Sequence, residues 1–203
     1  SQVLRVANSV AYAGAGGSAD SLPAAIMRLG FAEVSNLCLT AGTMTALASE
    51  TSSDLSQFWN HSATTALASG EIARIAEFVD VDCTERAGIG SPYYLAGLLH
   101  DVGVLVCRGA GLRRYQEVLE KNAVAREPLF VTETEFLGFH HGEVGAALAL
   151  VWGLPEIVIA AAEWHHEPTL APEEFRTAVE VVHLADWMTH HMGIGDAGDG
   201  VIE

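Results

Sequence analysis

Apolar residues recur along this chain at spacings of three and four positions, which is the period of an amphipathic helix. The stretch from Phe31 to Ala48 is an example, and its apolar positions are Val34, Leu37, Cys38, Ala41, Met44 and Leu47. Alternation with a period of two, typical of half-buried strands, is not found convincingly in the sequence. The pattern therefore predicts an all-α protein.

Start and stop residues divide this pattern into separate helices. Ser21 and Pro23 favour the start of a helix that Gly30 ends, and Gly153 with Pro155 separates two later helices. Thr132 or Thr134 is expected to cap a turn that ends near Gly138. The expected helices cover about residues 21–30, 31–48, 52–79, 112–122, 142–152, 155–165 and 172–192, and another opens at Ser91-Pro92.

These helices suggest an N-terminal helical lobe over residues 1–50, a larger helical domain over 51–192 and a Gly- and Asp-rich tail over 193–203. The 203 residues and the hydrophobic fraction of 50% suit one compact domain with a small lobe. No apolar run reaches the roughly 18 residues of a membrane span. The opening Ser-Gln-Val-Leu-Arg resembles the interior of a helix, so we expect a segment upstream of it.

The formal net charge of −16 excludes some partners. Nonspecific nucleic-acid binding and docking on anionic lipid both need a basic surface, so neither is expected. Cys38, Cys83 and Cys107 are odd in number and form no Cys-x-x-Cys pair. This pattern favours reduced thiols in a cytoplasmic protein over a disulfide framework.

The strongest chemical signal is an adjacent His and Asp inside the apolar stretch Ala96–Gly103. His100 and Asp101 are expected within a buried helix, where a charged group needs a hydrogen-bonding partner or a metal ion. Adjacent helical residues point about 100° apart. A single ion would therefore have to lie between these two side chains, or Asp101 would have to bridge two ions.

Further histidines lie on or at the ends of other apolar helices. Each of them alone is more often a satisfied core or boundary histidine than a ligand. Together with the carboxylates of Asp101 and Asp186 they form a donor set that suits zinc, iron, manganese or nickel. The additional positions are His61, His140, His141, His165 and His166.

Short motifs surround these positions: Leu4–Tyr12, Ser21–Gly30, Phe58–Ser62, Ala96–Gly103, His141–Gly145, Trp152–Pro155 and His165–Pro168. Together they resemble the HDOD (HD-related output domain) proteins of bacterial signalling, over roughly residues 2 to 190. The order of His and Asp residues resembles the HD superfamily of metal-dependent phosphohydrolases. The full His series is similar to its HD-GYP branch.

The resemblance implies a fold, a ligand set and a cofactor. It implies a helical HD-like domain that binds divalent transition metal, two or more ions of iron, manganese, zinc or nickel. Glu143 and Glu167 are candidates for orienting the ligands from an outer shell. The implied ligands are His61, His100, Asp101, His141, His165, His166 and Asp186.

Two departures from the HD-GYP pattern bear on catalysis. Active members have a lysine after His-Asp-x-Gly, where this chain has Val104, and Lys121 is the only lysine in the chain. They also have Asp-Gly-x-Gly-Tyr-Pro after the His pair, where this chain has Glu167–Pro172. Because a phosphodiester site usually needs cationic side chains besides its metals, these departures disfavour phosphate as a substrate.

Three functions stay open from the sequence. The first is a signalling output module that acts through other signalling proteins or an attached domain. The second is a metal-dependent phosphohydrolase acting on a nucleotide or cyclic dinucleotide, and the third is a di-iron enzyme that uses oxygen. A homodimer through the apolar face from Val34 to Leu47 is also open. His183, His190 and His191 are expected at the boundary or in solvent.

Overall fold

The computed structural model describes residues 8, 22–30, 34–36, 38, 42, 55–76, 91–109 and 113–196. Within these residues every regular element is a helix and there is no strand, which confirms the all-α prediction. Cys83, the expected caps at residues 52–54 and most of the expected helix over 31–48 lie outside the described residues. So do the Leu4–Tyr12 motif apart from Asn8 and the tail beyond residue 196.

The first described helices end or begin close to the predicted positions. Helix α2 spans Leu22–Leu29, and Gly30 follows it with a φ of +91°, a conformation that favours glycine at a helix C-terminus. Helix α4 spans Ser56–Ile75. One face of α4 is buried and consists mainly of small side chains, which allow neighbouring helices to approach closely.

The expected single helix around His100 and Asp101 is wrong in one respect. Helix α5 spans Pro92–Leu99 and α6 spans Val102–Gly109, so the pair lies at a break between two helices. The His100 ring hydrogen-bonds the carbonyl of Gly97 at 2.7 Å, and the Val104 N–H donates to the carbonyl of Asp101 at 2.9 Å. These short-range bonds replace part of the regular helical pattern, while His100 keeps right-handed helical dihedrals of −54° and −40°.

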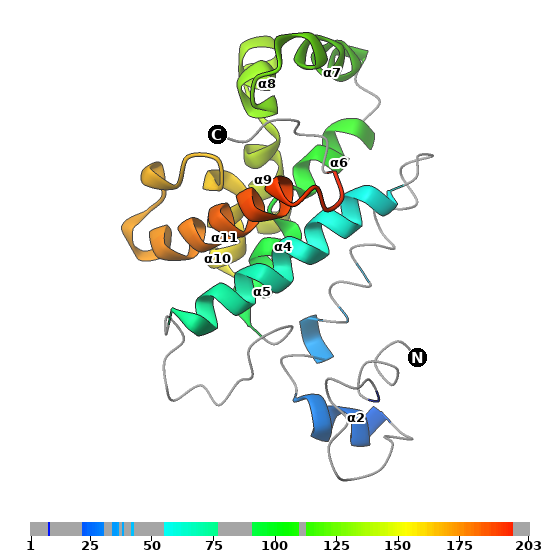
Figure 1. The fold of residues 1–203 in the computed structure, drawn as a ribbon, viewed down its shortest axis with the longest axis vertical. Helices are drawn as coiled ribbons and strands as arrows, with labels where there is room; N and C mark the ends of the chain where they lie inside the picture. Colours follow the sequence, from blue (N-terminus) through cyan, green and yellow to red (C-terminus); the bar gives the residue numbers. More distant parts are fainter. Residues whose placement is uncertain are drawn as a thin grey trace.

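Helices α7 (Arg113–Ala125) and α8 (Leu129–Leu137) form a hairpin at one end of the protein, at the top of Figure 1. The expected Thr caps are wrong, because α8 begins directly after Pro128, whose fixed φ suits a helix start. The hydroxyl of Thr132 donates to Glu127, and that of Thr134 donates to the carbonyl of Phe130. The predicted end at Gly138 is confirmed by its φ of +80°.

The remaining helices match the expected order. Helix α9 spans His141–Val151, α10 spans Glu156–Trp164 and α11 spans Glu173–His191, with a short 3-10 turn at Pro168–Leu170. Gly153, with a φ of +66°, separates α9 from α10 as predicted. The free thiols in the described part are Cys38, which is exposed, and Cys107, which is buried.

Helices α4, α5, α9, α10 and α11 pack together around one core (Figure 1). Glycines set two of the close contacts. A Cβ atom at Gly97 would lie 2.9 Å from the carbonyl oxygen of Thr65 on α4. A Cβ atom at Gly103 would overlap the carbonyl oxygen of His141 and lie 2.7 Å from the nitrogen of Gly145. The chain therefore brings α6 against the start of α9 with almost no space between their backbones.

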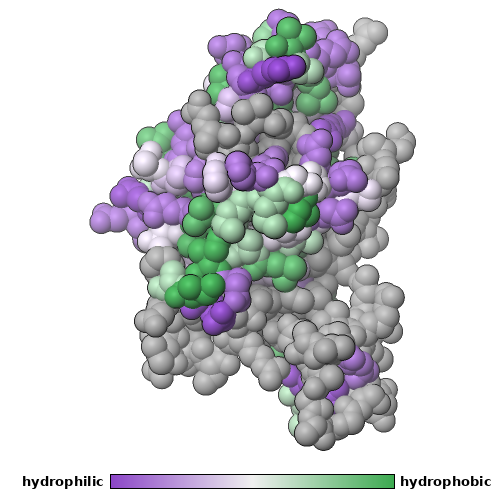
Figure 2. All heavy atoms as spheres, in the orientation of Figure 1, coloured by the Kyte–Doolittle hydropathy of each residue, from purple (hydrophilic) through white to green (hydrophobic). Residues whose placement is uncertain are grey.

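Hydrophobic residues gather on one face where α11 crosses α4, surrounded by hydrophilic side chains (Figure 2). The exposed apolar side chains of these two helices include Leu67, Leu184 and Met188. In the part of the chain that the structure describes, no single helix is long and apolar enough to cross a membrane. The bent pair Pro92–Gly109 and Arg114–Ala125 passes that test only when taken together, by length and composition.

Candidate metal centre

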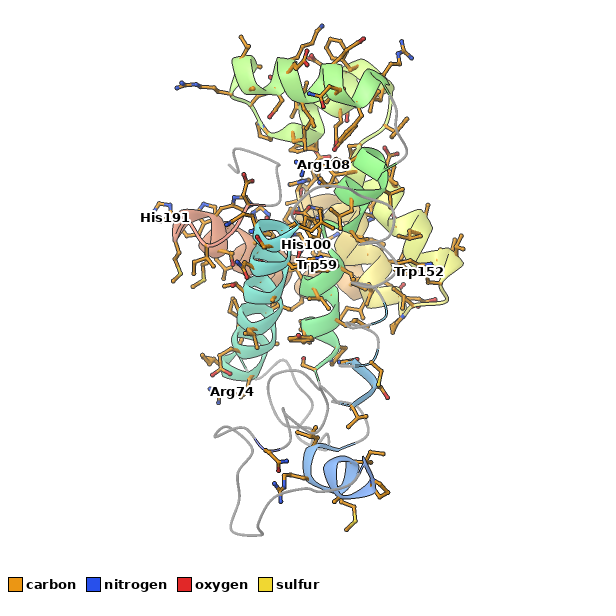
Figure 3. All side chains as sticks on the ribbon, turned by 90° about the vertical axis from the view of Figure 1, so that its right-hand side faces the viewer. Trp59, Arg74, His100, Arg108, Trp152 and His191 are labelled. Atoms are coloured by element: carbon orange, nitrogen blue, oxygen red, sulfur yellow. The ribbon has the colours of Figure 1, made fainter. Side chains whose placement is uncertain are left out.

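The seven implied ligands come from five parts of the fold and meet at one place. His61 comes from the middle of α4, His100 and Asp101 from the α5–α6 break, and Asp186 from α11. His141 is the first residue of α9, and His165 and His166 directly follow α10. Six of the seven side chains are at most 1% exposed, and His166 is partly buried. Figure 3 shows His100 inside the protein, whereas Arg74, Trp152 and His191 point outward.

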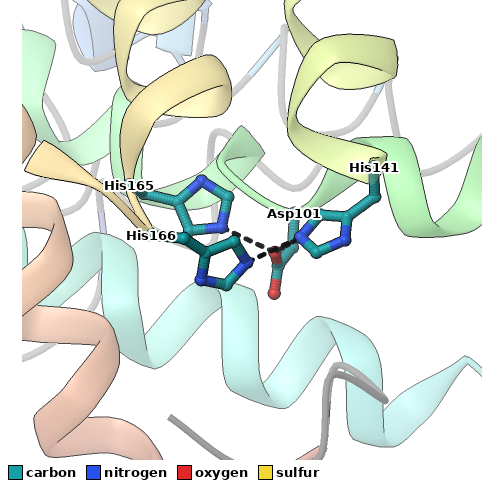
Figure 4. A group of neighbouring side chains, drawn as sticks. All are labelled: Asp101, His141, His165 and His166. Carbon is teal, nitrogen blue, oxygen red and sulfur yellow. Dashed lines mark hydrogen bonds and ion pairs between the residues drawn. The ribbon is translucent and has the colours of Figure 1, made fainter. Parts of the chain in front are cut away.

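The first group of ligand atoms surrounds one oxygen of Asp101 (Figure 4). The Oδ1 atom of Asp101 lies 3.2 Å from Nε2 of His165 and 3.4 Å from Nε2 of His141. The Nε2 atom of His166 lies 2.8 Å from that of His141. One ligand atom from each of these four residues lies within 4.8 Å of the others, a spacing suitable for a single metal ion.

The second group uses the other oxygen of Asp101. Its Oδ2 atom lies 3.3 Å from Nε2 of His100 and 3.9 Å from Nε2 of His61. The Oδ1 atom of Asp186 lies 2.9 Å from His61 Nε2 and 3.3 Å from His100 Nε2. These four residues also meet the 4.8 Å criterion. Asp101 belongs to both groups and turns one carboxylate oxygen toward each of them.

The residues present fit divalent metal. Buried polar atoms in proteins are normally hydrogen-bonded. Within the described residues, several buried ligand atoms here make no hydrogen bond, and they face the same small region. They are the Nε2 atoms of His61, His100 and His165, both carboxylate oxygens of Asp101, and Oδ1 of Asp186. Imidazole nitrogens with carboxylate oxygens suit transition-metal ions, as expected from the sequence.

Neighbouring charges shift the pKa values of the groups in the cluster. Burial opposes the charged form of each group, but the mutual attraction of His100 and the two aspartates outweighs it. The pKa values of Asp101 and Asp186 therefore lie well below the usual range for Asp, and the pKa of His100 lies well above that for His. Burial and the charges of His165 and His141 hold the pKa of His166 well below its ordinary value.

Removing divalent ions with a chelator is expected to lower the melting temperature of the protein. An ion that binds only the folded state at 100 times its Kd stabilises that state by about 2.7 kcal/mol. For a domain of this size the loss corresponds to roughly 5–10 °C per ion. Differential scanning calorimetry before and after chelation, with zinc added back, measures the effect. An unchanged melting temperature would contradict a bound ion.

Among the described residues, the two expected outer-shell carboxylates make no hydrogen bond to a candidate ligand. Glu143 accepts a hydrogen bond from the N–H of His140 at 2.9 Å and so caps α9, and its side chain is exposed. Glu167 is exposed and precedes the 3-10 turn. The carboxylate that hydrogen-bonds a ligand is Glu133 of α8, whose Oε2 lies 2.6 Å from Nδ1 of His141.

Glu133 was not among the residues expected near the site, although its place in the hydrophobic pattern of α8 is unusual for an acidic residue. It lies on the same helical face as Leu129 four residues before it and Leu137 four residues after it. The side chains of both Glu133 and Leu129 are fully buried. An acidic residue at a core position of an apolar helix requires a polar partner, and that partner is His141.

Of the three histidines expected at the boundary or in solvent, His183 lies at the boundary as expected, whereas His190 lies nearer the centre. The expectation that His190 faces solvent is wrong, because its Nε2 lies 3.6 Å from Oδ1 of Asp186 and its ring lies 4.4 Å from that of His61. The ring of His183 hydrogen-bonds the carbonyl of His165 at 2.6 Å. His191 is exposed, as expected, and stacks on Trp187.

A cavity of about 450 Å³ lies beside the cluster. Phe130 on its wall stacks on the ring of His166, with ring centroids 4.6 Å apart. Among the described residues, those that line the cavity include four carboxylates and no lysine or arginine. The acidic residues are Glu135, Glu143, Glu163 and Glu167.

Sequence comparison finds relatives of this chain. A family model described as "HDOD domain" matches residues 1–168. A Treponema pallidum (strain Nichols) protein, named only as uncharacterized, is 31% identical over 169 residues. The match covers 80% of this chain and 30% of that protein, so the chain spans about a third of the length of this relative.

Solved structures share the fold. An HDOD domain protein with unknown function from Geobacter sulfurreducens matches with a TM-score of 0.79 and 25% identity, over 100% of this chain and 64% of that one. A protein from Shewanella amazonensis SB2B, provisionally named a phosphohydrolase, matches with a TM-score of 0.75 and 20% identity, over 95% of this chain and 64% of that one. A protein from Marinobacter aquaeolei VT8, provisionally named a signal transduction protein, matches with a TM-score of 0.72 and 24% identity. That match covers 100% of this chain and 43% of that one.

Proposed function

Because this chain belongs to the HDOD domain family, we propose that it is a metal-binding signal-transduction module that acts through protein partners or an attached domain. The observation that carries the proposal is the pairing of two buried ligand groups with an acidic cavity beside them. The ligand groups favour bound metal, whereas four carboxylates around the cavity disfavour an anionic phosphate ester.

The metal would act by holding the fold together. One ion would be held by Asp101, His141, His165 and His166, and the other by Asp101, His61, His100 and Asp186. When bound, divalent ions supply positive charge that compensates the two buried aspartates. The ligands come from α4, the α5–α6 break, α9, the end of α10 and α11, so the centre would connect most of the helical core.

A metal-dependent phosphohydrolase is the second candidate. A carboxylate shared by two ligand groups suits a two-metal hydrolase, and the full ligand series is similar to the HD-GYP branch. Val104, at the position of the lysine in active HD-GYP members, is fully buried in the apolar core and offers no charge to a phosphate. A di-iron enzyme would use the same ligands, and spectroscopy of the bound metal would identify it.

Elemental analysis and a turnover assay together test this proposal. Protein purified without chelators is expected to contain about two divalent ions per chain, matching its two ligand groups. The metal-loaded protein is expected to hydrolyse bis-p-nitrophenyl phosphate and a cyclic dinucleotide no faster than its Asp101→Asn variant. Sustained hydrolysis that Asp101→Asn abolishes would overturn the signalling module in favour of the phosphohydrolase.

A further inference from the structure

Glu133 is a fully buried carboxylate whose two oxygens both have partners. Its Oε2 accepts hydrogen bonds from the backbone N–H of His141 at 2.8 Å and from Nδ1 of the same residue at 2.6 Å. Its Oε1 accepts a hydrogen bond from the hydroxyl of Tyr115 at 2.7 Å. Glu133 lies on α8, Tyr115 on α7 and His141 on α9, so this carboxylate links three helices.

The contact with His141 determines which ring nitrogen faces the cluster. A carboxylate at Nδ1 holds the proton there and leaves Nε2 as the nitrogen that faces Asp101 and His166. The same carboxylate oxygen also holds the backbone N–H, so the ring and the first residue of α9 are fixed together. Histidine ligands of metals commonly have such an outer-shell partner, which orients the ring and raises its basicity.

The contact with Tyr115 extends this arrangement into the α7–α8 hairpin. Tyr115 is 2% exposed, and in Figure 1 the hairpin stands apart from the helices that supply the other ligands. The hydrogen-bonded series Tyr115–Glu133–His141 therefore runs from the interior of the hairpin to a ligand of the first group.

We infer that Glu133 is the positioning residue that makes His141 a metal ligand, and that Tyr115 couples the α7–α8 hairpin to metal occupancy through it. This inference rests on the proposed metal centre and names the element that would respond to it. Coupling between two sites is reciprocal. If the Tyr115 contact raises metal affinity by a certain factor, bound metal raises the equilibrium constant for packing of the hairpin against the core by the same factor.

Cobalt(II) binding to three variants tests the positioning role. Glu133→Gln removes the charge but keeps the size, and it is expected to weaken binding of one of the two ions by about 10–100-fold. Its visible spectrum should change for that ion only. Glu117→Gln alters an exposed carboxylate on α7, outside the cavity lining, and is the matched control, expected to bind as the wild type does. Tyr115→Phe is expected to lower the affinity by a smaller factor, about 5-fold.

Hydrogen exchange tests the coupling. Metal is expected to slow amide exchange in α7 and α8 of the wild type and to slow it less in Tyr115→Phe. If the wild type binds two ions and Glu133→Gln binds both with unchanged affinity, the positioning role is wrong. If metal leaves exchange in the wild-type hairpin unchanged, the coupling is wrong.

Circular dichroism checks that Glu133→Gln folds. If it does not, the cobalt affinity of Tyr115→Phe tests the inference instead, and an affinity equal to that of the wild type overturns it. Failure of the underlying metal centre has a different signature. It would appear as a wild-type protein that binds no cobalt at all.

Discussion

Asp101→Asn is expected to abolish binding at both metal positions, the largest single effect on metal content in this protein. The two carboxylate oxygens of Asp101 face different ligand groups, at 3.2 Å from His165 Nε2 and 3.3 Å from His100 Nε2. An amide is neutral, and its NH₂ group would face one set of imidazoles in place of a ligand oxygen. Affinity should fall by more than the roughly 100-fold that loss of an outer-shell partner costs.

Elemental analysis after gel filtration measures this result, and Asp186→Asn is the matched control. Asp186 belongs only to the second ligand group, so its variant should retain about one ion per chain. Circular dichroism checks that both variants fold. Equal metal loss in the two variants would contradict the bridging role of Asp101, and so would wild-type metal content in Asp101→Asn.

Gly103→Ala is expected to cause the largest loss of stability. The added Cβ would overlap the carbonyl oxygen of His141 and lie 2.7 Å from the nitrogen of Gly145. Both contacts are backbone atoms, so α6 and α9 would have to separate, and His141 would move away from Asp101. We expect a loss of about 3 kcal/mol, at the upper end of overpacking effects, and a melting temperature roughly 10 °C lower. Metal affinity should fall with it.

Thermal unfolding measures the stability loss, with Gly145→Ala as the control on the other side of the same contact. A Cβ at Gly145 would have its nearest neighbour at 3.3 Å, a tight distance but one that needs only a small shift. Its cost should be about 1 kcal/mol or less. Equal melting temperatures for the two variants would show that the α6–α9 contact is looser than the structure indicates.

Local sequence signals predicted helix ends well where Gly or Pro restricts the backbone dihedral angles. Gly30, Gly138 and Gly153 end helices at positive φ, and Pro92 starts one after the Ser91 cap. The start of α8 differs from the prediction, because Pro128 and not a Thr side chain precedes its first residue. The Thr hydroxyls bond instead to Glu127 and to a backbone carbonyl.

The candidate ligand set was implied by the resemblance to the HD superfamily, through residue types in a recognisable order. His61 and Asp186 are 125 positions apart, and no spacing rule relates them. Their 2.9 Å contact depends on α11 packing against α4. Glu133 shows the same limit, because its burial at a core position could be read from the sequence but its partner His141 could not.

By itself the sequence determined the helical class and most helix ends, since these depend on local periodicity and on Gly and Pro. The candidate metal ligands were implied by the resemblance to the HD superfamily. The tertiary structure decided that His100 and Asp101 lie at a helix break, that Asp101 faces two ligand groups, and that Glu133 holds His141. These features depend on how closely helices approach, and that distance is set by contacts between residues far apart in the chain, such as Gly103 with His141.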